Sequence, residues 1–202
     1  MKIIAIGRNY TEHAHELHNP VPEKPVIFLK PDTALLKNRD FYYPDFSQNI
    51  HHEIEIVLGI CKEGKHISRK FAHTYYDAIG LGIDFTARDI QQQHKEQSLP
   101  WELAKAFDGS APVSTLLPKD TFDDPYAIDF SLTKNGEVVQ RGNTKDLIFS
   151  FEDILVFVSQ YITLRKGDLI FTGTPAGVGS GAVGDYQEGF IGEQRMLHLH
   201  VK

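Results

Sequence analysis

The 202-residue sequence contains a single cysteine, Cys61, and therefore no pair that could form an intramolecular disulfide. It has no apolar run near the ~20 residues that cross a bilayer, and the run at its start is too short for a secretion signal. Basic residues number 21 against 27 acidic ones, so no basic surplus is available to bind phosphates or an anionic membrane surface. These shortages predict a cytoplasmic protein without a nucleic-acid or membrane partner.

The overall composition is typical of a soluble globular protein. Hydrophobic residues make up 41% of the chain and charged residues 24%, and no repeat or linker divides it. We therefore expect one domain over residues 1–202. Predicted strands outnumber helices without regular alternation, which favours an α+β fold of mostly mixed sheet.

Several local signals support this reading. Asn135-Gly136 predicts a hairpin between 128–133 and 137–141. Ser150 and Asp153 resemble a capping box before a helix over 151–163. We also expect Ser68 to cap a helix ending near Asp77, Thr86 to open a helix ending near Gln97, and residues 51–60 to form a half-buried strand.

The most informative segment is His51-His52-Glu53-Ile54-Glu55. Residues two apart on a strand point the same way, at roughly 6–7 Å. Two carboxylates side by side repel each other unless a cation lies between them. A solvent-exposed strand face explains the pair equally well. A glycosidase pair is disfavoured, because acids on one strand face do not easily flank a sugar bond.

A third acid, Asp84, follows the predicted strand 79–85 and precedes a helix. Three oxygen ligands without cysteine indicate a hard cation, Mg²⁺ or alternatively Mn²⁺. Taken alone, Asp84 is better explained as the N-cap of the following helix.

Seven motifs in order resemble the fumarylacetoacetate hydrolase family, in its acylpyruvate hydrolase and oxaloacetate decarboxylase branch. They run from Gly7 almost to the end of the chain. The motifs are Gly7-Arg8-Asn9-Tyr10, His13-x-x-Glu16, Phe28-Leu29-Lys30-Pro31, His51-x-Glu53-x-Glu55, Asp84-x-Thr86-Ala87-Arg88-Asp89-x-Gln91, Leu99-Pro100-Trp101 and Thr172-Gly173-Thr174-Pro175-x-Gly177-Val178-Gly179.

The resemblance implies a β-sandwich roll with a few short helices, a homodimer, and a small 2-oxo acid as substrate. It also implies that Glu53, Glu55 and Asp84 are the metal ligands. The extra N-terminal domain of fumarylacetoacetate hydrolase itself is missing from this sequence, which disfavours that activity.

His13 and Glu16 lie three residues apart and share a face if their segment is helical. A carboxylate beside an imidazole orients it and raises its basicity, as a water-activating base requires. Without the resemblance, an exposed helix surface explains them better. In the family branch, this pair lies on a mobile lid, which corresponds here to residues 10–22.

The resemblance also assigns the remaining candidates. It implies that Lys105 stabilises an oxyanion and that Arg88 and Gln91, three apart on a helix, bind the carboxylate and oxo groups of the substrate. Without it, each basic side chain is as well explained as a surface charge. The other substrate-binding candidates are Arg8, Lys30 and Thr174.

The resulting prediction is a Mg²⁺-dependent enzyme that hydrolyses the C–C bond of acylpyruvates, or decarboxylates oxaloacetate, through a stabilised pyruvate enolate. One alternative is an isomerase, decarboxylase or hydratase of hydroxymuconate-type intermediates in aromatic catabolism. Another is a metal-binding homologue without catalysis.

Overall fold

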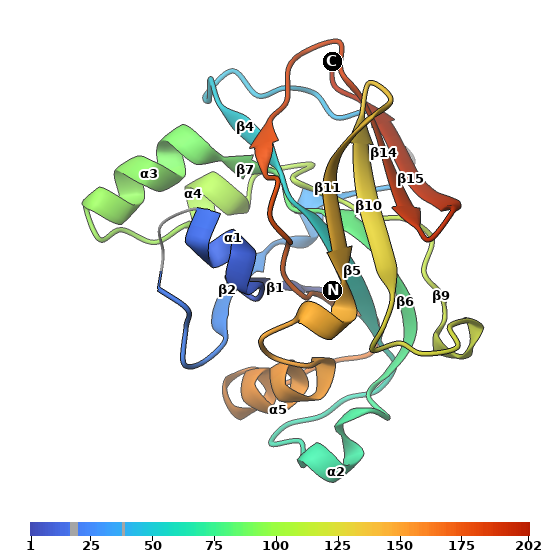
Figure 1. Cartoon of the computed structure of the whole chain (residues 1–202). Helices are drawn as coiled ribbons and strands as arrows, with labels where there is room; N and C mark the ends of the chain where they lie inside the picture. The colour runs from blue at the N-terminus through green and yellow to red at the C-terminus, as the bar shows by residue number, and fades with distance from the viewer. Residues whose placement is uncertain (17–19, 38) are drawn as a thin grey trace.

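The computed structural model describes residues 1–16, 20–37 and 39–202. Its largest sheet has six strands in the order β2-β1-β12-β5-β6-β9 (Figure 1). β1 and β12 run parallel and the other neighbours antiparallel, so the sheet is mixed as expected. The strands are β1 (Ile3–Gly7), β2 (Val26–Lys30), β5 (Ile54–Ile60), β6 (Tyr76–Ile83), β9 (Leu117–Pro118) and β12 (Leu169–Phe171).

A second, antiparallel sheet has four strands in the order β11-β10-β14-β15. The remaining strands of the described residues form two smaller sheets, β13-β4-β7 and β3-β8. Their bounds are β10 (Asp129–Lys134), β11 (Glu137–Asn143), β14 (Tyr186–Ile191), β15 (Gln194–His200), β13 (Gly179–Ser180), β4 (Ile50–His52), β7 (Thr86–Ala87), β3 (Leu35–Leu36) and β8 (Ala111–Pro112).

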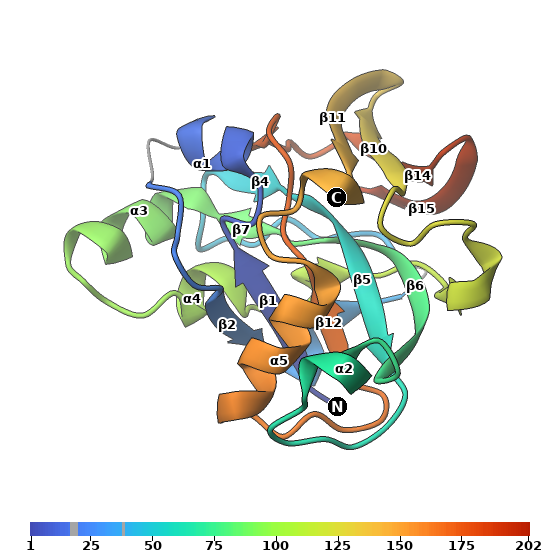
Figure 2. The same cartoon turned by 60° about the horizontal axis from the view of Figure 1, so that its bottom comes forward.

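The helices are short and lie around the sheets. α5 crosses one face of the six-stranded sheet (Figure 2), and none of the helices in the described ranges is long and apolar enough to span a membrane. The helices are α1 (Thr11–Glu16), α2 (Arg69–Ala72), α3 (Arg88–Glu96), α4 (Glu102–Lys105) and α5 (Phe151–Tyr161). The α+β prediction of mainly mixed sheet with a few short helices is confirmed.

The six-stranded sheet is apolar on both faces. Ile54, Ile56 and Leu58 of β5 pack in the cluster that contains the inner side of α5, whereas Val57 packs with β12 on the other face. Every residue of β5 is buried. The prediction of a half-buried strand is therefore wrong, because both faces of this strand are covered.

The predictions based on local sequence signals were only partly confirmed. Asn135 and Gly136 have φ of 55° and 84°, as the predicted hairpin turn requires, and Ser150 with Asp153 forms the capping box of α5. The helix expected to extend from Ser68 to Asp77 ends at Ala72, because Tyr76 begins β6. The helix expected from Thr86 begins at Arg88, since Thr86 and Ala87 pair with β4.

Candidate metal centre and active site

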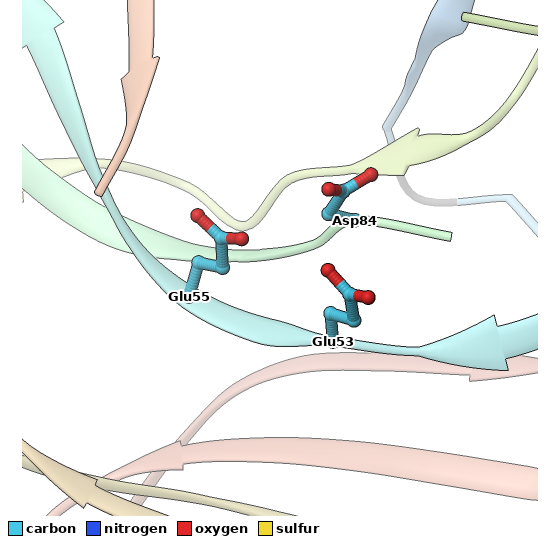
Figure 3. A group of neighbouring side chains, drawn as sticks. All are labelled: Glu53, Glu55 and Asp84. Atoms are coloured by element: carbon cyan, nitrogen blue, oxygen red, sulfur yellow. The ribbon is translucent and has the colours of Figure 1, made fainter. Parts of the chain in front are cut away.

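Three carboxylates meet where β5 and β6 leave the sheet. Glu53 immediately precedes β5, Glu55 lies within it, and Asp84 follows β6. In Figure 3 the three side chains point toward one another, and one oxygen of each lies within 4.8 Å of the others. All three are at most 4% exposed, which excludes the solvent-exposed strand face. Asp84 is not an N-cap, because that position belongs to Ala87.

The charges on these acids are unevenly compensated. Lys105 Nζ lies 2.8 Å from Glu53 Oε2, and Arg88 contacts the other oxygen of Glu53. Burial favours the protonated form of Glu53, but the charges of Lys105 and Arg88 outweigh it and lower its pKa. Glu55 instead accepts a backbone hydrogen bond from Gly173 at 2.6 Å, and burial together with the charges of Asp84 and Glu53 raises its pKa.

This donor set fits a divalent cation. Three convergent carboxylate oxygens are the ligands that hard cations prefer. Burial, followed by the charges of Asp84 and Glu53, raises the pKa of Glu55, so repulsion from these two acids adds to the cost of burying it. A divalent cation would remove that repulsion and favour ionised Glu55.

Lys105 and Lys30 pair with the two carboxylate oxygens of Asp84. Lys105 Nζ lies 2.5 Å from Asp84 Oδ2 and Lys30 Nζ lies 2.7 Å from Oδ1. Lys105 lines the cavity above the acids, whereas Lys30 is 1% exposed and also donates to Ser110 Oγ at 2.9 Å. Lys30 therefore lies behind Asp84, a position that favours holding this carboxylate over contacting substrate directly.

His13 projects from α1 into the same cavity and is 4% exposed. Its Nδ1 lies 3.4 Å from Glu16 Oε2, and Glu16 Oε1 accepts a hydrogen bond from the Gly177 amide at 3.1 Å. Burial lowers the pKa of His13, so its imidazole is neutral at pH 7. The pair thus has the arrangement of a proton acceptor and its orienting group. The proposed lid, 10–22, includes residues 17–19, which lie outside the described residues.

Arg88 and Gln91 share one face of α3. Arg88 Nη1 donates to Gln91 Oε1 at 2.6 Å, and Arg88 Nε lies 3.5 Å from His51 Nδ1. Both Arg88 and Gln91 line the cavity with Thr174, which follows β12. Of the predicted site residues, the structure brings nine to one cavity: Arg8, His13, Glu53, Glu55, Asp84, Arg88, Gln91, Lys105 and Thr174.

Two further polar residues support this arrangement and were not predicted. Gln140 of β11 is 1% exposed; it accepts from the Ile54 amide at 2.9 Å and donates to Thr174 Oγ1 at 2.9 Å. It therefore links the strand of Glu55 to the turn of Thr174. Lys95 of α3 also lines the cavity. Gln140 lies in no local motif, so only the pairing of distant segments identifies it. Lys95 lies seven residues after Arg88 on the same helix, so helical spacing could have identified it.

Comparison with known proteins agrees with this geometry. The sequence model described as "Fumarylacetoacetate (FAA) hydrolase C-terminal" matches residues 2–199. The chain belongs to the fumarylacetoacetate hydrolase family. Among members of this family, the mouse protein named oxaloacetate tautomerase FAHD1, mitochondrial, is 44% identical over 178 residues, which cover 88% of this chain and 80% of the mouse protein.

Two other proteins of the family are also similar to this chain. A Dictyostelium discoideum protein named oxaloacetate decarboxylase, mitochondrial, is 41% identical and aligns with 88% of this chain and 83% of its own. The crystal structure of a fumarylpyruvate hydrolase from Pseudomonas aeruginosa, in complex with Mn²⁺ and pyruvate, superposes with a TM-score of 0.94 at 36% identity. That match covers 100% of this chain and 89% of the hydrolase.

Proposed function

We propose that this protein is a divalent-cation-dependent enzyme that hydrolyses the C–C bond of acylpyruvates, with Mg²⁺ as its cation and Mn²⁺ as an alternative. The observation that carries the proposal is the buried His13, which faces the same cavity as the three-carboxylate cluster. A metal-binding protein without catalysis would have no need for a proton acceptor there. The relative solved with Mn²⁺ and pyruvate supports both the cation and the product class.

Each residue has a defined task in this reaction. When bound, the cation supplies Lewis-acid stabilisation of the negative charge that develops on the 2-oxo acid. Arg88, Gln91 and Thr174 bind and orient the substrate carboxylate and oxo groups. His13 accepts a proton from the water that attacks C4, and Glu16 holds the imidazole in place. The C3–C4 bond then breaks and its electron pair passes to C3, which gives a carboxylic acid and the pyruvate enolate. Return of the proton that His13 accepted to C3 gives pyruvate.

Lys105 contributes a positive charge at the cavity floor. Its ammonium group here offsets Glu53 and Asp84. Because Lys105 also lines the cavity, its ammonium group is placed to donate to the oxyanion that forms at C4.

Oxaloacetate is a second candidate substrate, favoured by the names of the mouse and Dictyostelium relatives. Loss of CO₂ from oxaloacetate gives the same pyruvate enolate and requires no water attack. Tautomerisation moves a proton from C3 to the 2-oxo oxygen and therefore also needs a proton acceptor. Decarboxylation does not need His13 to activate water, so the His13→Ala variant separates decarboxylation from hydrolysis.

The test is a panel of acetylpyruvate, fumarylpyruvate and oxaloacetate with Mg²⁺, Mn²⁺ or a chelator, followed by pyruvate release. We expect turnover that stops with the chelator. His13→Ala should slow acylpyruvate hydrolysis about 100-fold or more and spare oxaloacetate decarboxylation. Glu63→Gln, which alters an exposed acid, serves as the control. Equal hydrolysis by His13→Ala and the parent would refute the assigned base.

The assembly and location belong to the same proposal. We expect a homodimer of single catalytic domains spanning 1–202, which light scattering of the purified protein tests. The names of the mouse and Dictyostelium relatives place those proteins in mitochondria. A cytoplasmic location for this chain therefore needs a direct test by fractionation.

A further inference from the structure

Gln140 joins two parts of the active site from behind the residues that line the cavity. Its side chain is 1% exposed. Its Oε1 accepts from the Ile54 amide at 2.9 Å, while its Nε2 donates to Thr174 Oγ1 at 2.9 Å and to Pro175 O at 3.0 Å. Ile54 separates the two glutamates of the metal centre, and Thr174 faces the cavity. The buried amide therefore bridges the metal-binding strand and the substrate-binding turn.

The backbone partners of Gln140 fix which end of its amide faces Thr174. The Ile54 N–H can only donate and the Pro175 carbonyl can only accept, so Nε2 must lie on the side of Thr174. Thr174 Oγ1 thus accepts a hydrogen bond from the protein. For its own proton, the described residues offer only Pro175 O at 3.5 Å, which is long for an O–H···O hydrogen bond. The proton is therefore available to an acceptor in the cavity.

A β-bulge accompanies the inward position of Gln140. Leu132 of β10 lies opposite Gln140. The next residue of β10, Thr133, lies opposite Val138, so Val139 is an extra residue in this pairing. Bulges of this kind redirect side chains next to active sites. The local backbone of β11 thus supports a role for Gln140 in the site.

The turn that carries Thr174 packs directly on β11. At Gly177, whose φ is 95°, an added Cβ would lie 2.2 Å from Val139 O, so no side chain fits there. Pro175 packs against the strand at Gly142, where an added Cβ would lie 2.9 Å from Pro175 Cγ. These contacts hold the backbone of the turn close to the strand, and the amide of Gln140 then determines how the Thr174 hydroxyl is used.

We propose that Gln140 is a positioning residue that directs the Thr174 hydroxyl to donate to an oxygen of the bound substrate. The inference rests on the proposed function, because it takes a 2-oxo acid to bind at Thr174. Without the Gln140 amide, Pro175 O loses its donor and attracts the Thr174 proton, so the substrate loses a hydrogen bond. Gln140 should therefore contribute to substrate affinity only through Thr174.

The test is a double-mutant cycle on the affinity for pyruvate. Titration calorimetry at saturating Mg²⁺ gives the dissociation constants of the wild type, Gln140→Met, Thr174→Val and the double variant. Thr174→Val should raise Kd about tenfold, because it removes a hydrogen bond to a charged ligand, and Gln140→Met should raise it about fivefold. In the Thr174→Val background, Gln140→Met should change Kd by less than about twofold. A merely structural role of Gln140 would not produce this dependence on the hydroxyl.

Two further variants complete the test. Gln187 of β14 is also buried, but its side-chain amide has no hydrogen-bond partner in the described part of the chain, so Gln187→Met should leave Kd within about twofold. Gln140→Asn keeps the amide but is one methylene shorter, and it should weaken binding as Gln140→Met does. It replaces Gln140→Met in the cycle if that variant does not fold.

Several results would overturn the inference. They are a wild type that does not bind pyruvate, an unchanged Kd in either single variant of the cycle, an equal loss of affinity in Gln187→Met, and the same effect of Gln140→Met with and without the Thr174 hydroxyl.

Hydrolysis of acetylpyruvate reports separately on the proposed reaction. If acetylpyruvate is not cleaved but the cycle shows the expected dependence, the reaction is wrong and the role of Gln140 stands. Cleavage of acetylpyruvate with an additive cycle gives the reverse conclusion.

Discussion

At the scale of single residues, burial acts in opposite senses on the acids and on the histidine of the site. It raises the pKa of Glu55 and lowers the pKa of His13, in both cases because the charged form loses hydration. Burial also acts to raise the pKa of Glu53, but the charges of Lys105 and Arg88 outweigh it and lower this pKa. Two carboxylates two positions apart on the chain thus have different electrostatic environments.

The lowered pKa of His13 predicts the pH dependence of hydrolysis. A proton acceptor must be neutral, and burial keeps this imidazole neutral to a pH below its ordinary value of about 6.5. Activity should therefore fall only below pH 6.5, as His13 becomes protonated. The measurement is the acid limb of kcat/KM for acetylpyruvate. An inflection above pH 6.5 would contradict the assigned environment of His13.

At the scale of elements, the site depends on a few buried side chains that join chain segments distant in sequence. Asn9, fully buried after β1, donates to Thr172 O at 2.8 Å and Phe149 O at 3.1 Å, and accepts from the Phe149 amide at 2.8 Å. It joins the segment that carries Arg8 to the end of β12 and to the loop before α5.

Asn9→Ala should lower the free energy of unfolding by about 3 kcal/mol, because it leaves buried backbone groups without partners. Urea denaturation followed by circular dichroism measures the change. The control is Gln160→Ala on the exposed side of α5, expected to cost under about 0.5 kcal/mol. Similar decreases in the free energy of unfolding of the two variants would show that Asn9 does not hold these segments together.

The secondary-structure elements also show which features can be predicted from the sequence. The β10–β11 hairpin and the α5 capping box depend on neighbouring residues, and both were predicted correctly. The length of α2 and the burial of both faces of β5 depend on distant elements that cover them, and both predictions were wrong.

For the site, motif resemblance located the acids and the residues around them. It missed Gln140, because a glutamine within a hairpin strand has no local signal until β11 lies beside the turn of Thr174. It also placed Lys30 in the pocket, whereas the structure buries this lysine behind Asp84. Motif membership therefore identifies the neighbourhood of a residue more readily than the direction of its side chain.

At the scale of the whole molecule, the buried acidic cluster links folding to cation binding. Mg²⁺ or Mn²⁺ at 100 times its dissociation constant should raise the free energy of unfolding by about 2.7 kcal/mol, because only the folded chain brings the three acids together. Thermal unfolding with and without the cation measures this. Glu55→Gln should abolish the increase and Glu63→Gln should retain it. A stability increase of the same size in Glu55→Gln would disprove binding at this cluster.

The order of strands in the large sheet has a consequence for synthesis. β12 lies between β1 and β5, so the first strand of the protein meets the rest of the sheet through a strand some 166 residues later, with Ile3 opposite Leu169. On the ribosome, the free edge of the β1–β2 pair stays unpaired until residues 169–171 emerge. Such long-range closure is slow and leaves a strand edge open to aggregation. Chaperone dependence should therefore be greatest for chains stalled just before β12.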